Sequence, residues 1–448
     1  MKAGNVLGTV LFALLANGCI KSGSPVGEAD AERFGTIGAA NTATRGDEGQ
    51  YLERVVQVYA EGWQTCALTE DGSVYCWGGS DGLVEDGLRG LATPPARPYA
   101  IPAEQAMERL YGGRREHLRT ISTSGTIFVS GGLASCEGPE YEHRVKRWLE
   151  TFPEEVSLGD DDRVFSSRLL PMPTSIPAGA RLLQGPISAE SCYAGGETEL
   201  RCIRDCGGPS TSYLRNAEAP YLRPGFLLDE RTPFLSADGY TVYGGPVECR
   251  DYQKQQRGEC DRSPAFEMAF ESEPREMLAR GRVLIVLDAY GRVSFVKVPQ
   301  LRDYSGKRST GEPERLGSFG AGITTIGLME AVARVCAVRE DATVECQHPY
   351  PAAPPFGPKT REVQGAEDIV QLSGGSFHMC GLRRDGRVMC WGLNTRGQLG
   401  NGGVLEQEVE QSHATFVVAP EGGQSDGPVV AHRMGYAFNA PGTTPAEP

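Results

Sequence analysis

The sequence predicts an all-β protein built from repeated β-hairpins, and three observations lead to this prediction. Residues 369–403 form two apolar runs around a short turn, and residues 55–79 repeat the same pattern. Cysteines recur in pairs at one spacing along the chain. The chain has 58 glycines and 30 prolines but only 8% aromatic residues, a composition that suits many turns joined by short strands.

The hairpin within 369–403 can be aligned from its turn. Two strand-like runs flank residues 384–386, and Gly386 suits the last position of a three-residue loop, where the backbone is left-handed. Counting outward from the centre of this loop places Cys380 opposite Cys390. The alternation of an antiparallel ladder favours an open pair for these cysteines, in which side chains approach most closely. We therefore expect a disulfide across the hairpin.

The segment 55–79 has the same turn, the same cysteine pair and the same Trp-Gly exit. The equivalent residues are Asp71-Gly72 and Asp385-Gly386, Cys66/Cys76 and Cys380/Cys390, and Trp77-Gly78 and Trp391-Gly392. Trp77 and Trp391 recur in register, so we interpret them as packing residues between repeats.

These residues together resemble the regulator-of-chromosome-condensation repeat, a β-propeller blade. Its pattern, His-x-Cys-x-Leu-x-x-Asp-Gly-x-Val-x-Cys-Trp-Gly-x-Asn-x-x-Gly-Gln-Leu-Gly, is matched from His378 to Gly400. The first copy has Gln64 in place of His378 and lacks the Asn and Gln-Leu-Gly end. The resemblance implies a β-propeller that acts by contact with other proteins.

A looser form of the pattern recurs between the two strong copies. An apolar residue lies four positions before the turn residue, another lies two after it, and a small residue lies six after it. This places turns at residues 72, 125, 198, 239, 291, 342 and 386, about fifty residues apart on average. Seven units fit the usual seven-bladed ring of the family, with six or eight as alternatives. The expected core strands include Val55–Tyr59, Cys66–Leu68, Val74–Trp77 and Ile369–Leu372.

Segments rich in proline, glycine and charge separate these units, and we interpret them as long loop insertions. They are Leu91–Arg115, Glu137–Pro177, Gly207–Gly225, Arg250–Glu276, Arg302–Gly317 and Pro349–Glu362. Short helices are expected at Ala103–Leu110 and Glu142–Phe152. A final strand at Phe416–Val418 or at Val429–Ala431 is expected to close the ring.

The N-terminus predicts export. Residues 1–18 have one lysine, a short apolar run and small residues, as in a signal peptide. The small residues before Cys19 resemble a bacterial lipobox, so we predict lipidation of Cys19; the alternative is an ordinary leader cleaved near residues 16–18. Residues 19–50 are then a flexible tether, 51–435 the propeller and 436–448 a disordered tail.

The cysteines favour an oxidising compartment. Of 13 cysteines, twelve remain after Cys19. Four pairs share one spacing, the fifth is one residue longer, and the sixth is assigned by elimination: Cys66/Cys76, Cys192/Cys202, Cys336/Cys346, Cys380/Cys390, Cys249/Cys260 and Cys136/Cys206. Such spacing predicts disulfides. The alternative, structural zinc, usually begins with closely spaced ligands, which only Cys202 and Cys206 approach. We expect no metal and no cofactor.

Charge and motifs exclude several functions. The net charge of −14 and pI near 5.1 argue against nucleic-acid binding. The chain has no P-loop and no H-E-x-x-H motif. His117 and His378 occupy equivalent repeat positions, so we interpret them as structural. The acidic run 160–162 lacks the spacing of a calcium loop and is interpreted as a solvated loop.

Two functional hypotheses remain. The first is a lipid-anchored propeller of the cell envelope, at the outer membrane or the cell surface, or otherwise a secreted one, that binds another protein through its loops. Aromatic residues in the insertions are its candidate contacts: Tyr141, Trp148, Tyr213 and Tyr221. The second is a propeller hydrolase or lyase with a site at the central channel. We expect a binding protein rather than an enzyme, with a protein partner, no nucleic acid, and the lipid as its only membrane attachment.

Overall fold

The computed structural model describes part of the chain, and all that follows concerns this part. The described residues are 50–79, 96–111, 117–133, 139–151, 156–158, 164–175, 181–182, 190–194, 199–204, 211–214, 221–224, 233–236, 241–244, 267–280, 283–297, 314–329, 331–347, 361–405, 411–421 and 424. They all belong to one compact unit, Ala40–Pro448.

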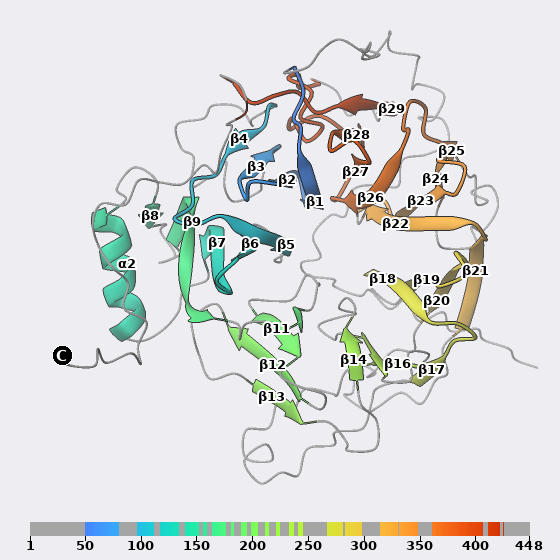
Figure 1. Ribbon diagram of the computed structural model, residues 1–448, viewed down its shortest axis with the longest axis horizontal. Helices are drawn as coiled ribbons and strands as arrows, with labels where there is room; N and C mark the ends of the chain where they lie inside the picture. Colours follow the sequence, from blue (N-terminus) through green and yellow to red (C-terminus); the bar gives the residue numbers. More distant parts are fainter. Residues whose placement is uncertain are drawn as a thin grey trace, which may run out of the picture. The chain divides into compact units, whose positions relative to one another are not determined.

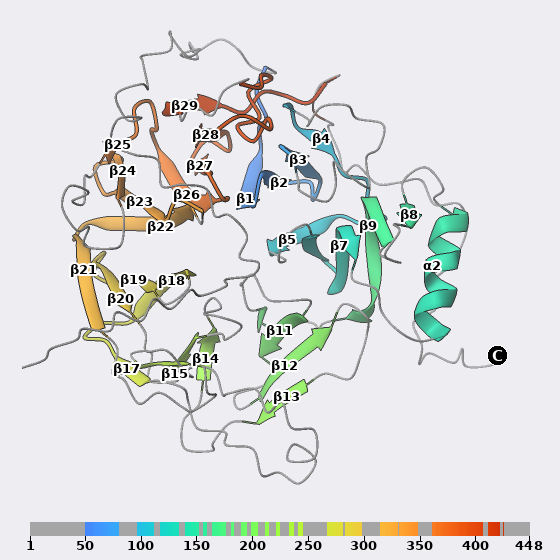
Figure 2. The ribbon, with the colours of Figure 1, turned by 180° about the vertical axis from the view of Figure 1, so that it is seen from behind.

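The described strands form seven antiparallel sheets that succeed one another around a ring (Figure 1), and the view from behind shows the same succession (Figure 2). Neighbouring sheets touch through their first strands: β1 contacts β5 and β26, and β22 contacts β18 and β26. This is the seven-bladed β-propeller that the sequence predicts.

The strands of each sheet follow chain order except in the second sheet. The first sheet has β1 (Val55–Glu61), β2 (Gln64–Thr69), β3 (Val74–Trp77) and β4 (Tyr99–Ala100). The second has β5 (Met107–Tyr111), β6 (His117–Ser122), β7 (Thr126–Leu133), β9 (Val164–Ser175) and β8 (Val156–Leu158). The third has β10 (Arg181–Leu182), β11 (Glu190–Ala194), β12 (Glu199–Arg204) and β13 (Thr211–Leu214). The fourth has β14 (Tyr221–Pro224), β15 (Pro233–Ser236), β16 (Thr241–Gly244) and β17 (Glu267–Ala269).

The fifth sheet has β18 (Pro274–Arg280), β19 (Val283–Asp288), β20 (Val293–Lys297) and β21 (Glu314–Gly320). The sixth has β22 (Ile323–Met329), β23 (Arg334–Arg339), β24 (Val344–Gln347) and β25 (Arg361–Glu362). The seventh has β26 (Ile369–Gly374), β27 (His378–Arg383), β28 (Val388–Gly392) and β29 (Gln411–Phe416). Helix α2 (Pro139–Thr151) lies outside the ring beside β8 (Figure 1).

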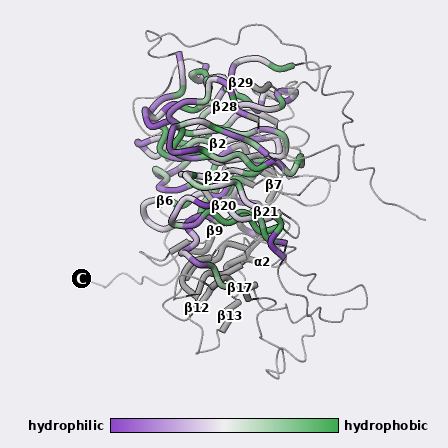
Figure 3. Tube along the Cα trace, turned by 90° about the vertical axis from the view of Figure 1, so that its right-hand side faces the viewer, coloured by the Kyte–Doolittle hydropathy of each residue, from purple (hydrophilic) through white to green (hydrophobic). Residues whose placement is uncertain are grey.

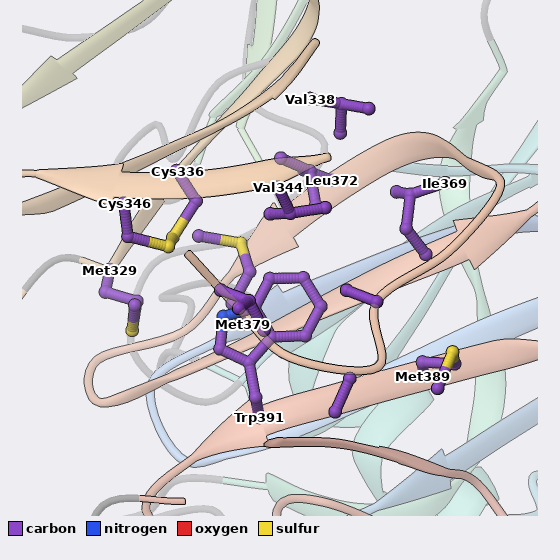
Figure 4. Close-up of a cluster of buried hydrophobic side chains, with 13 residues drawn as sticks. Met329, Cys336, Val338, Val344, Cys346, Ile369, Leu372, Met379, Met389 and Trp391 are labelled. Carbon is purple, nitrogen blue, oxygen red and sulfur yellow. A yellow bond between two sulfur atoms is a disulfide. The ribbon is translucent and has the colours of Figure 1, made fainter. Parts of the chain in front are cut away.

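The hydrophobic core is divided among the seams between sheets, because the middle strands bury both of their faces. In the seventh sheet, Cys380 and Cys390 pack toward the first sheet. Met379 and Trp391 alternate with them and pack toward the sixth sheet. Figure 4 shows this second cluster, with the Cys336–Cys346 disulfide beside Met379. Seen from the side, hydrophobic residues mostly follow the strands (Figure 3).

The turn between the second and third strands has the same geometry in every sheet where it is described. The last loop residue donates its N–H to the carbonyl three residues earlier at 2.9–3.0 Å, with φ between 68° and 82°; these residues are Gly72, Gly125, Gly291, Ala342 and Gly386. The predicted register is confirmed in six hairpins. In the fourth sheet it is wrong by one residue, because Leu235 lies opposite Val242 and so pairs two apolar residues instead of Leu235 with Thr241.

The cysteine pairs follow the predicted hairpins. The structure has disulfides at Cys66–Cys76, Cys336–Cys346 and Cys380–Cys390, with Cα atoms 4.0–4.1 Å apart, as in the open pairs of an antiparallel ladder. Cys192 lies opposite Cys202 in the third sheet, although their side chains are not described. Cys136, Cys206, Cys249 and Cys260 lie outside the described residues.

The ring closes by pairing the two ends of the described chain. Val418 forms an antiparallel bridge with Tyr51, and the Leu52 N–H donates to the Val417 carbonyl at 3.1 Å. The Phe416 ring lies 4.9 Å from that of Tyr51. The first predicted closing segment, Phe416–Val418, therefore does close the ring, although strand β29 ends at Phe416 and Val418 forms an isolated bridge. The second, 429–431, lies outside the described residues.

The predicted insertions contain one of the two expected helices and several strands that were not expected. The helix expected at Ala103–Leu110 is wrong, since Met107–Tyr111 is strand β5 and begins the second sheet. The helix expected at Glu142–Phe152 is present as α2. The insertions also contain outer strands, and Gly207–Gly225 holds both the last strand of one sheet, β13, and the first strand of the next, β14. The sequence pattern does not predict these strands, because an outer strand such as β21 is largely exposed and lacks a continuous apolar pattern.

Candidate protein-interaction surface

The meander topology gives the ring two faces. Turns between the first and second strands lie at one end of each sheet, and turns between the second and third strands lie at the other end. We call the former the first-turn face, which in the described chain carries Trp63, Ala331 and Phe377. Tyr290, on the β19–β20 turn, lies on the opposite, second-turn face.

The first-turn face carries a group of three side chains that we call the aromatic cluster: Trp63, Phe377 and Arg396. The rings of Trp63 and Phe377 stack with centroids 4.7 Å apart and an interplanar angle of 28°. The Arg396 guanidinium lies 5.0 Å from the centre of the Trp63 ring. All three side chains are only partly buried. The cluster therefore presents two rings and a cation to solvent at the seam between the first and seventh sheets.

The backbone beneath the aromatic cluster is held by hydrogen bonds across the seams. The Ser376 N–H donates to the Gly62 carbonyl at 2.6 Å, and the Ala331 N–H donates to the Ser376 carbonyl at 2.9 Å. A Cβ on Gly375 would lie 2.7 Å from the Gly62 carbonyl oxygen, so only glycine permits this approach. These bonds fix three neighbouring turns relative to one another.

The segment that ends the repeat pattern fixes the third member of the cluster. The Gly79 N–H donates to the Arg396 carbonyl at 2.9 Å, and the indole of Trp77 donates to the Gln398 carbonyl at 3.0 Å. Gly400 has φ of 63°, and a Cβ there would lie 2.7 Å from Cδ1 of Trp77. The Gln-Leu-Gly segment at the end of the last repeat, which the first repeat lacks, thus packs on Trp77 of the first sheet.

Below the cluster, the repeat histidine has a structural role, as predicted. His378 is fully buried, and its Nε2 lies 2.6 Å from the Thr65 hydroxyl of the first sheet. Burial lowers the pKa of His378 to about 3, so the ring is neutral at physiological pH. The side chain of His117, its predicted equivalent, is not described.

A cavity of about 370 Å³ lies in the fifth sheet, and its lining includes Glu271, Asp288 and Arg292. Burial raises the pKa of the Asp288 carboxylate, but hydrogen bonds from Ser272 and Arg292 together outweigh burial and lower it. Arg292 Nε lies 2.7 Å from that carboxylate, which also accepts the N–H groups of Tyr290 and Arg292. Asp288 therefore holds its own turn through these hydrogen bonds.

The described residues contain no group of three or more His, Cys, Asp or Glu side chains placed to hold a metal. Likewise, none of the helices in the described ranges has the length and apolar character needed to cross a membrane.

The predicted contact residues are scattered rather than gathered at one site. Trp148 of α2 is only 3% exposed, which makes it a packing residue and not an exposed contact. Tyr141 also lies on α2, and Tyr213 and Tyr221 lie in β13 and β14, but these three side chains are not described. Cys19 and residues 160–162 lie outside the described residues.

Sequence reasoning missed the aromatic cluster, although a signal was present. Trp63 and Phe377 occupy the same repeat position, directly before Gln64 and His378. An aromatic residue recurring beside a turn indicates either packing or a surface contact, and only the placement of adjacent sheets distinguishes the two.

Comparison with known proteins agrees with the repeat pattern. The sequence profile of the Regulator of chromosome condensation (RCC1) repeat matches residues 55–81 and 369–398. No curated protein sequence matches the chain significantly.

The chain is also similar to several solved structures at low sequence identity. Human WBSCR16 is 15% identical, with 78% of this chain and 94% of that chain covered and a TM-score of 0.48. The β-propeller domain of Swd1 from Myceliophteria thermophila is 11% identical, with 79% and 99% covered and a TM-score of 0.48. Yeast RCC1 bound to Kap60 is 14% identical, with 81% and 74% covered and a TM-score of 0.38.

Proposed function

We propose that this chain, a β-propeller with RCC1 repeats, is a binding protein that holds a protein partner on its first-turn face through the aromatic cluster. The observation that carries the proposal is the partly exposed stack of Trp63, Phe377 and Arg396. Tryptophan and arginine are the residue types that most often dominate binding energy at protein interfaces.

The rigidity of the cluster supports the proposal. Binding costs free energy when side chains and loops become ordered. Here the turns of Gly62 and Ser376 are already joined by a hydrogen bond, and the stacked rings restrict each other. A partner would therefore meet a preformed surface, and little additional ordering would oppose association.

A variant of the cluster tests this proposal. The tagged full-length protein and its Trp63→Ala variant are expressed in the native envelope, and crosslinked partners are quantified by mass spectrometry. We expect the recovered partner to fall at least tenfold with Trp63→Ala. Loss of the stack costs about 0.5–1.5 kcal/mol, which the fold tolerates. A matched melting temperature confirms that the fold is retained.

Two further variants make the result specific. Arg396→Ala removes the cation without breaking the stack and is expected to weaken capture in the same direction. Tyr290→Ala removes an aromatic side chain that is 72% exposed on the second-turn face and should leave capture unchanged. Loss of the partner with Tyr290→Ala but not with Trp63→Ala would place the interface on the second-turn face and contradict the proposal.

We further propose that the protein is exported and held at the cell envelope by a lipid on Cys19. The leader-like residues 1–18 and the disulfides of three hairpins support an oxidising compartment. Mass spectrometry of the membrane-extracted protein should find a diacylglycerol-modified N-terminus at Cys19. An unmodified N-terminus at another residue would exclude the anchor.

A further inference from the structure

The first strand of each sheet exposes backbone groups that another sheet must satisfy. In an antiparallel pair, the N–H and C=O of a residue in an open pair both point away from the partner strand. In the sixth sheet Cys336 and Cys346 form an open pair, so the backbone N–H and C=O of Cys336 face Gly327 on the first strand. The N–H and C=O of Ile326, the residue beside Gly327, therefore point outward, away from their own sheet. Val58 and Leu110 occupy the equivalent position in the first and second sheets.

A glutamine of the preceding sheet satisfies both outward groups in two of the described seams. Gln57 donates to the Leu110 carbonyl at 2.7 Å and accepts the Leu110 N–H at 2.8 Å. Gln371 donates to the Val58 carbonyl at 3.3 Å and accepts the Val58 N–H at 3.2 Å. A side-chain amide suits this position because it offers one donor and one acceptor in one plane.

The seam between the fifth and sixth sheets has a glutamate at the same repeat position. The pairing of the first strand with the second shifts register directly before Glu276, as it does before Gln57 and Gln371, so the three residues occupy equivalent positions. Glu276 accepts the Ile326 N–H at 3.1 Å and the Thr325 hydroxyl at 3.1 Å. An ionised carboxylate only accepts hydrogen bonds, so it has no donor for the outward Ile326 carbonyl.

We propose that Glu276 is a proton-dependent clamp between the fifth and sixth sheets. In its neutral form, the carboxylic acid offers the donor and acceptor that Gln57 and Gln371 offer, and it bonds both outward groups of Ile326. In its ionised form, it makes only the acceptor bonds. The fifth and sixth sheets are therefore joined by more hydrogen bonds when the pH falls and by fewer when the pH rises.

The surroundings of Glu276 favour proton uptake. The paired strand β19 places Leu287 opposite it, and β22 presents Thr325 and Ile326. Arg275 is the charged residue that acts on it within the described chain, and its positive charge favours the ionised form. Burial raises the pKa of Glu276 by more than Arg275 and the two hydrogen bonds lower it.

The sign of the pH dependence follows from this shift. A carboxyl group whose pKa is higher in the folded than in the unfolded chain stabilises the fold fully below the unfolded value, about 4.3 for glutamate. That stabilisation is lost as the pH rises through the folded value. Above its folded pKa, Glu276 therefore weakens its seam relative to a glutamine.

Reciprocal substitutions test the clamp. Glu276→Gln is expected to raise the melting temperature at pH 7.5, and its advantage over wild type should shrink as the pH is lowered to 4.5. Gln371→Glu should lower the melting temperature at pH 7.5 and recover part of the loss at pH 4.5. Hydrogen exchange of peptides covering 323–329 should show greater protection in Glu276→Gln at neutral pH.

The control is Glu108→Gln, an exposed glutamate on the first strand of another sheet, which should show no pH-dependent difference. A difference between Glu276→Gln and wild type that is constant across pH, or a lower melting temperature at every pH, would overturn the clamp. The test does not depend on the partner, because the aromatic cluster lies at a different seam.

Discussion

Single polar residues decide how well neighbouring sheets of this propeller are joined. His378 and Thr65 meet at 2.6 Å inside the seam between the first and seventh sheets, where water does not reach. Burial of a polar group costs free energy unless the group is hydrogen-bonded, and burial of an unpaired charge costs far more. The seam therefore depends on His378 remaining neutral.

His378 should make the stability of the protein pH-dependent. Its pKa is about 3 in the fold, below the usual value near 6.5, so the unfolded chain binds a proton that the folded chain does not. Between these values the free energy of unfolding should fall as the pH falls, by up to about 1.4 kcal/mol per pH unit. Denaturant unfolding of His378→Gln across pH 4–7 should show a shallower slope than that of the wild type.

The glutamine in this prediction is the residue that the first repeat itself has at that position, Gln64. The control is His413→Gln, since His413 is exposed and should retain the wild-type slope. An unchanged slope in His378→Gln would mean that other groups account for the acid sensitivity.

At the scale of elements, the unit of this fold is the central hairpin of each sheet. Its three-residue loop needs left-handed backbone at the last position, and glycine supplies it in four of the five described turns of this type. The sixth sheet has Ala342 there, with φ of 68°. The Cys336–Cys346 disulfide spans this hairpin, and a loop of this size restricts the unfolded chain by about 2.5–3 kcal/mol.

Ala342→Gly should stabilise the protein. Alanine in left-handed backbone costs about 1 kcal/mol or more, and glycine removes that strain at a smaller cost in unfolded-chain entropy. We expect the free energy of unfolding to rise by about 0.5–1 kcal/mol. The opposite change, Gly386→Ala, should lower it, because Gly386 has φ of 80°. Equal stability of both variants to wild type would show that turn strain does not limit these hairpins.

At the scale of the whole molecule, the ring depends on a short closing contact between its ends. Val417 is fully buried with Leu52 and Trp77 in the cluster between the first and seventh sheets. The backbone bonds of Leu52 to Val417 and of Ala419 to Gln50 hold the same junction. These bonds join the two ends of the described ring directly, and the radial repetition of sheets in a propeller leaves only short, protected edges.

Disruption of the closing contact should destabilise the whole ring. Val417→Asp places a charge in a dry cluster and should lower the free energy of unfolding by more than about 3 kcal/mol. Val404→Asp makes the same substitution at a residue that is 44% exposed and should change it by less than about 0.5 kcal/mol. Thermal unfolding compares the two variants, and similar melting temperatures would contradict a role for the junction in closure.

Much of the architecture is predictable because the central hairpins are encoded locally. Turn residues, cysteine spacing and flanking apolar residues all lie within about ten residues of one another, and together they set the register. Outer strands such as β4 and β25 are two residues long and have no comparable pattern. The helix predicted at Ala103–Leu110 failed because β5 pairs with a strand further along the chain, and that pairing overrides local preference.

By itself, the sequence predicted seven repeats, with six or eight as alternatives, six of the seven hairpin registers and the cysteines that face each other across hairpins. Each of these rests on residues that are neighbours in the chain. Only the tertiary structure decided which residues meet across seams. Trp63 stacks on Phe377, His378 bonds Thr65, and the distinction between Gln371 and Glu276 matters only because each faces the open edge of the next sheet. These contacts join residues from different repeats, and the closure of the ring, rather than any local preference, brings them together.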